Sequence, residues 1–102
     1  MSDLDALTQQ LRDFARQRDW DQFHTPKNLA MAVASEAGEL VAEFRWLTPE
    51  QSMSASLTAK QRHDIAMEIA DVMIFLTRLA DVVDIDILEV CAEKIDLNEV
   101  RF

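Results

Sequence analysis

Four carboxylates fall in two matched pairs that could bind a metal ion. Glu36 and Glu39 stand three positions apart, and Glu68 and Asp71 repeat that spacing. Residues three apart share one face of an α-helix, so each pair would present two carboxylates side by side. Oxygen ligands alone, with no histidine or thiolate in either pair, suit a hard ion such as Mg²⁺ or Mn²⁺. The spacing therefore predicts a divalent metal site.

The alternative interpretation is a solvated acidic face, which is what an isolated Glu-x-x-Glu usually forms. Two matched pairs favour the metal site, because each pair borders an apolar stripe and like charges gathered beside a core repel one another. Gly38, the one glycine of the chain, stands between Glu36 and Glu39. Glycine inside a helix costs roughly 0.5 to 1 kcal/mol relative to alanine, and either close helix packing or the approach of a substrate would explain it.

The carboxylate pairs lie on two of four expected helices. Apolar residues at alternating spacings of three and four predict helices over about 2–18, 25–46, 58–83 and 86–99. Their capping signals are Ser2 with Asp5, Thr25 before Pro26, Thr58 with Gln61, and Asp86 with Glu89. A further pair of this form, Thr48 with Gln51, predicts one short helical turn between the second and third helices. The chain is expected to be all-α.

The rotational positions of the acidic residues predict how the second and third helices pack. Both acidic sets stand at a similar angle, in the same rotational sense, from the apolar stripe of their own helix. Antiparallel packing through the stripes would place both sets on one side of the seam, whereas parallel packing would separate them. Each set also lies on the order of 10 to 15 Å from the connection between the helices, at 1.5 Å per residue. We therefore expect the two pairs to meet.

Composition limits the possible functions. At 102 residues with a formal charge of -9, residues 1–102 are expected to form one small domain. The charge argues against binding to nucleic acid or to an anionic membrane. A single cysteine, Cys91, excludes an intramolecular disulfide, and we expect it to be an inert core thiol. No signal peptide or transmembrane run is evident, so a cytoplasmic setting is expected.

Several segments beyond the carboxylates resemble a known family. Glu36-x-x-Glu39 with Glu68-x-x-Asp71 is similar to the metal signature of the all-α nucleotide pyrophosphohydrolases, the MazG-like superfamily. The segments that resemble its dCTP pyrophosphatase branch are 18–24, 26–29, 35–46 and 94–98, which carry Trp20, Trp46, Lys94 and Asn98. The resemblance covers most of the chain. At Leu11 the chain departs from it, because some relatives carry a polar substrate contact there.

The resemblance implies a four-helix bundle, intertwined in a homodimer or in a homotetramer built as a dimer of dimers. It implies Mg²⁺-dependent cleavage of a nucleoside triphosphate, dCTP in the first place, to the monophosphate and pyrophosphate, as in cleansing of the nucleotide pool. Position by position, it makes Glu36, Glu39, Glu68 and Asp71 the metal ligands, and Trp20, Trp46, Lys94 and Asn98 the substrate contacts. Turnover is expected to depend most on Glu39 and Glu68, although sequence does not separate a ligand from the base that positions water.

Two other functions remain open on the sequence. One is a different substrate within the superfamily, such as dUTP, phosphoribosyl-ATP or mixed deoxynucleotides. The other is a non-enzymatic helical module whose acidic face meets a basic partner. The expected core stripe of the third helix is Ile65, Ile69, Val72, Leu76, Leu79 and Val83. Oligomerisation is expected in either case, because this helix is apolar beyond its core stripe, at Ala66, Ala70, Met73 and Ile74. Trp20 and Trp46 would stand roughly 30 to 40 Å apart along one helix, so they can share a base only across subunits.

Overall fold

The positions of the helices follow from their caps. The computed structural model describes residues 2–102, in the order α1 (Asp3–Gln17), η1 (Asp21–Phe23), α2 (Pro26–Phe44), η2 (Ser54–Ser56), α3 (Ala59–Val82) and α4 (Ile87–Arg101). Capping boxes close the starts of α1 and α3, Thr25 and Pro26 open α2, and the side chain of Asp86 accepts from the Glu89 amide. All four predicted helix starts are confirmed, and residues 2–102 contain no strand.

The connection between α2 and α3 contains the expected short helical turn. Thr48 and Gln51 exchange both hydrogen bonds of a capping box, at 2.9 and 3.1 Å, and the Ser52 amide donates to the Thr48 carbonyl at 3.0 Å, which closes a single turn. A 3-10 turn at Ser54–Ser56 follows it. A cap satisfies orphan amides without supplying the packing that propagates a longer helix, so the turn does not extend.

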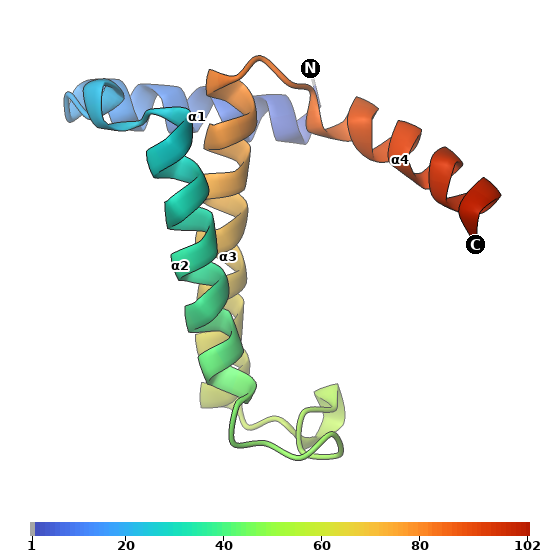
Figure 1. The fold of residues 1–102 in the computed structure, drawn as a ribbon. Coiled ribbons are helices and arrows are strands. Elements are labelled where there is room, and N and C mark those ends of the chain that lie inside the picture. The colour runs from blue at the N-terminus through green and yellow to red at the C-terminus, as the bar shows by residue number, and fades with distance from the viewer. Residues whose placement is uncertain (1) are drawn as a thin grey trace.

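Two long helices, α2 and α3, form the body of the chain. They run antiparallel and side by side, and α1 lies across one end of the pair (Figure 1). The small core holds Ala15, Leu29, Ile65 and Ala80, together with buried Thr77 and Arg78. The antiparallel arrangement on which the carboxylate prediction depended is therefore observed.

The fourth helix projects away from this body (Figure 1). Most of its apolar side chains are exposed, namely Leu88, Val90, Ile95, Leu97 and Val100, and so is Phe102 directly after it. Cys91 is exposed as well, so the prediction of a core thiol is wrong. On α3, Ile69 and Leu76 of the expected core stripe are also exposed, because α2 covers only one side of that helix. Within residues 2–102 no helix has the length and hydropathy needed to cross a membrane.

Candidate active site

Three carboxylates from α2 and α3 meet on one side of the helix pair. Glu36, Glu68 and Asp71 each offer one oxygen, and these three oxygens all lie within 4.8 Å of one another. All three side chains are half-buried. The antiparallel packing thus brings together two positions from one helix and one from the other, in the arrangement that a cation would need.

Glu68 is the strained member of this group. Its Oε2 atom is buried and has no hydrogen-bond partner in residues 2–102. Burial raises the pKa of the Glu68 carboxyl, and the neighbouring charges of Asp71, Glu36, Glu39 and Glu43 raise it further. A buried carboxylate oxygen without a donor is unfavourable unless a cation supplies the missing interaction. The residues present therefore fit a divalent ion, and their oxygen chemistry suits Mg²⁺ or Mn²⁺.

Glu39 and Gly38 stand at the edge of this group. Glu39 is exposed and lies outside the three oxygens that converge, although its charge contributes to the raised pKa of Glu68. A Cβ atom built on Gly38 would meet nothing within 4 Å in the described residues. Close packing of helices within one chain therefore does not explain the glycine. Asp64, one turn before Glu68, is paired with Lys60 at 2.7 Å and so belongs to the surface.

A cavity of about 220 Å³ adjoins the carboxylates. Its lining residues are Leu11, Phe14, Ala15, Trp20, His24, Asp71, Ile74, Phe75 and Arg78. Asp71 belongs both to this wall and to the carboxylate group. Trp20 is held edge-on to Phe14, with ring centroids 5.6 Å apart, and keeps 42% of its surface exposed. The cavity is thus a mostly apolar, aromatic-lined space beside a candidate metal site.

Behind the cavity lies a charged network that the sequence did not predict. Arg78 is only 8% exposed and donates through all three nitrogens: Nε to His24 Nδ1 at 3.1 Å, one terminal nitrogen to Asp81 at 3.2 Å, and the other to Asp21 at 2.8 Å. Arg12 binds both oxygens of Asp81, at 2.6 and 2.7 Å. The sequence contains one signal for this network: Arg78 and Asp81 are three apart on one helix, a spacing that allows an ion pair.

The network changes the titration of two groups. The hydrogen bond from Arg12 lowers the pKa of Asp81, and the charges of Arg12 and Arg78 lower it further against the effect of burial. Burial lowers the pKa of His24, the charge of Arg78 adds to this, and Asp21 opposes it. His63 lies outside this network and is exposed at the start of α3.

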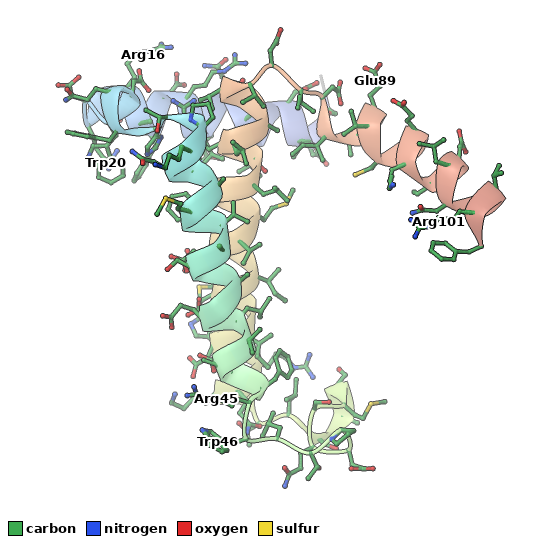
Figure 2. All side chains as sticks on the ribbon, viewed as in Figure 1. Arg16, Trp20, Arg45, Trp46, Glu89 and Arg101 are labelled. Atoms are coloured by element: carbon green, nitrogen blue, oxygen red, sulfur yellow. The ribbon has the colours of Figure 1, made fainter. Side chains whose placement is uncertain are left out.

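The remaining predicted substrate contacts lie elsewhere in the chain. Trp20 and Trp46 stand at opposite ends of α2 (Figure 2), and Trp46 is 83% exposed. Lys94 and Asn98 belong to the projecting α4, exposed and half-buried respectively. One chain therefore gathers Glu36, Glu68, Asp71 and Trp20 and leaves the other contacts apart. A second cavity, of about 230 Å³, lies where α1, α3 and α4 meet and contains none of the four predicted metal ligands.

Comparison with known proteins identifies the family of the chain. No protein-family model matches the chain. The proteins named dCTP pyrophosphatase 1 from Mus musculus and Homo sapiens are each 36% identical to it over 90 residues, which is 88% of this chain and 53% of each relative. The chain thus spans about half the length of these curated relatives. The crystal structure of a pyrophosphatase from Archaeoglobus fulgidus is 33% identical, with a TM-score of 0.90 over 100% of this chain and 94% of that one. The chain belongs to the MazG-like family of all-α pyrophosphatases, and within it resembles the dCTP pyrophosphatase branch.

Proposed function

We propose that this protein hydrolyses a nucleoside triphosphate, with dCTP as the preferred substrate, to the monophosphate and pyrophosphate. The observation that carries this proposal is the double role of Asp71, which links the carboxylate group to an aromatic-lined cavity. A base held in the cavity would place its triphosphate beside the carboxylates. The names of the relatives supply the choice of dCTP.

The carboxylates have two tasks in this proposal. Glu36, Glu68 and Asp71 would hold Mg²⁺, with Glu39 as a fourth ligand or as the group that accepts a hydrogen bond from the attacking water. When bound, the ion supplies charge neutralisation and polarisation at the phosphates. Water oxygen attacks the α-phosphorus, the bond from that phosphorus to the bridging oxygen breaks, and pyrophosphate leaves. The exposure of Glu39, outside the converging oxygens, supports its role toward water.

The cavity suits a single base. Its volume of about 220 Å³ is below the roughly 300 to 1,000 Å³ of pockets that enclose whole small molecules. Trp20 lines this cavity, and stacking on an aromatic contributes about 1 to 3 kcal/mol per base. The base would therefore be held by stacking, while the sugar and phosphates extend toward Asp71.

The remaining contacts would come from a second copy of the chain. Trp46, Lys94 and Asn98 do not reach the carboxylates of their own chain, and α4 exposes an apolar surface with no described partner in residues 2–102. We expect a homodimer or homotetramer in which α4 of one subunit covers the site of another. Lys94 would then approach a phosphate, and Asn98, which can donate and accept, a sugar or base edge.

A panel of triphosphates with identification of both products tests the proposal. The protein should release pyrophosphate and the monophosphate from dCTP faster than from dUTP, dATP or dTTP, and should require Mg²⁺. Asp64→Asn is a matched control, because Asp64 carries the same charge one turn away from Glu68 but is paired with Lys60. Release of orthophosphate would contradict the proposed bond cleavage. A protein that hydrolyses none of the panel would favour the interaction module.

A further inference from the structure

The second cavity, of about 230 Å³, carries an excess of negative charge. It lies where the start of α1 comes beside the start of α4 (Figure 1). Its charged lining residues are four carboxylates and one guanidinium, namely Asp5, Asp81, Asp84, Asp86 and Arg12. Arg12 already binds both oxygens of Asp81. The other three carboxylates therefore have no salt bridge to any of residues 2–102.

These three carboxylates are held in place by the backbone. Asp5 Oδ2 accepts from the Ser2 amide at 3.2 Å, and Asp86 Oδ1 accepts from the Glu89 amide at 3.1 Å. Each of these caps uses one carboxylate oxygen, so the second oxygen is available to a ligand. Asp84 follows the end of α3 with a left-handed φ of 59°, and its side chain accepts no hydrogen bond from residues 2–102.

Thr77 adds an independent sign of a missing ligand. It is the most buried residue of the cavity wall, at 1% exposed, and its Oγ1 atom has no hydrogen-bond partner in residues 2–102. Thr77 shares one face of α3 with Ala80, Asp81 and Asp84, which line the same wall, so its side chain is directed toward the cavity. A buried hydroxyl without a partner is unfavourable, and a donor in the cavity would satisfy it.

Charge and geometry limit what this cavity can bind. Carboxylates would repel a phosphate or a nucleotide. A divalent metal needs several converging oxygens, but the three carboxylates whose oxygens lie within 4.8 Å of one another in residues 2–102 are those on α2 and the middle of α3, outside this cavity. Leu4, Ile85 and Ile87 add apolar wall next to the acidic residues. An alkyl chain that carries ammonium groups matches both kinds of surface.

We propose that this cavity binds a linear alkyl diamine or polyamine, whose ammonium groups engage Asp5, Asp84 and Asp86 and donate to Thr77 Oγ1. Since Asp5 belongs to α1 and Asp86 caps α4, the bound amine links the start of α4 to the body of the chain. The site shares no lining residue with the cavity of Trp20 and contains none of the metal-site carboxylates. Its occupation is therefore independent of the proposed function.

Isothermal titration calorimetry of the full chain with 1,4-diaminobutane tests the proposal. At constant ionic strength, one diamine should bind per chain, with the same Kd in the presence and absence of Mg²⁺. Butylamine, which has a single ammonium group, should bind about 10-fold more weakly. Asp84→Asn removes one charge with a residue that tolerates left-handed backbone, and should raise the Kd about 2- to 5-fold. Asp64→Asn, an equal change of charge outside the cavity, should leave the Kd unchanged.

Thr77→Val has a signature that a generally acidic surface would not give. Valine keeps the shape of threonine without the unpaired hydroxyl, so the free protein should melt at a higher temperature while the Kd for 1,4-diaminobutane rises. An unchanged Kd in Asp84→Asn would overturn the proposal, and so would an absence of binding at millimolar diamine. Displacement of the diamine by Mg²⁺ would assign the binding to the metal-site carboxylates and overturn it as well. If Asp84→Asn does not fold, an unchanged Kd in Thr77→Val decides against the site.

Discussion

Helix α3 carries two charged clusters that differ in how they are balanced. At its middle, Glu68 and Asp71 join Glu36 with no cation from residues 2–102, and the pKa of Glu68 is raised. Near its end, Arg78 and Asp81 meet Arg12 and Asp21 in a fully paired network, and the pKa of Asp81 is lowered. The second cluster is complete within one chain, whereas the first requires a charge from outside. This difference supports a structural role for the Arg78 network and a binding role for the carboxylate group.

Removing Arg78 should produce the largest loss of stability. Arg78→Met leaves Asp21 and the already half-buried Asp81 without the central guanidinium, and breaking a buried ion pair typically costs about 3 to 5 kcal/mol. Urea unfolding followed by far-UV circular dichroism would measure it. Arg12→Met, which removes a half-exposed partner of the same Asp81, should cost less. Equal losses of stability in the two variants would mean that the exposed Arg12 contributes as much to the network as the buried Arg78.

Changing the unbalanced cluster should affect activity and leave the fold intact. Glu68→Gln removes a predicted ligand while relieving repulsion, so we expect at least about a 100-fold loss of pyrophosphate release, beyond the roughly 10- to 100-fold typical of second-shell changes. The helical circular dichroism signal of Glu68→Gln should remain. We expect the same combination, lost activity with an intact fold, for Glu39→Gln. Asp64→Asn should stay active. A fully active Glu68→Gln protein would refute the site assignment.

The two tryptophans should differ in what they contribute. Trp20→Ala removes the stacking surface of the cavity and should weaken all nucleotides by a similar factor, about 10-fold for roughly 1.4 kcal/mol of stacking. Trp46→Ala should raise the KM values only if a second subunit brings Trp46 to the site. Comparing KM values for both variants across the triphosphate panel distinguishes these cases. If only Trp46→Ala is damaging, the base is not held in the cavity of Trp20.

Magnesium should stabilise the unbalanced cluster. An ion that binds only the folded state adds about 1.4 kcal/mol at ten times its Kd, which corresponds to roughly 5 to 10 °C in Tm for a domain of this size. The shift should vanish in Glu68→Gln and persist in Asp64→Asn. An absence of any shift at millimolar Mg²⁺ would favour the acidic interaction module.

The pH dependence should have opposite signs at the two clusters. Asp81 has a lowered pKa, so its contribution to stability is present above the ordinary value of 3.8 and is lost as pH falls through the folded value. Glu68 has a raised pKa, so in EDTA its unfavourable charge is relieved as pH falls toward 4.5. Urea midpoints between pH 7 and 3 should therefore fall less steeply for Asp81→Asn than for the unchanged protein. In EDTA, the urea midpoint of the unchanged protein should first rise as pH falls toward 4.5, because Glu68 becomes neutral. This rise should be absent in Glu68→Gln.

The sequence predicted features that depend on local signals, and it missed features that depend on how the helices pack. The helix starts followed from caps within four residues, and the meeting of Glu36 with Glu68 and Asp71 followed from helix periodicity and one packing choice. Periodicity identifies a face but does not say what covers it, which is why Cys91 and Ile69 were expected inside. Arg78 joins residues 54 and 57 positions away, and no local pattern encodes such contacts.

Under the proposed function, the position of Asp71 couples the binding of the nucleotide to the binding of a cation. A triphosphate that enters the cavity beside Asp71 meets the negative charges of the carboxylate group, so binding without a cation is opposed by repulsion. A bound cation turns that repulsion into attraction, and the linkage is reciprocal: whatever factor the ion adds to nucleotide affinity, the nucleotide adds to the affinity for the ion. Neither ligand needs to bind tightly alone. In a cell, the concentration of free magnesium would then set the fraction of the protein that has nucleotide bound.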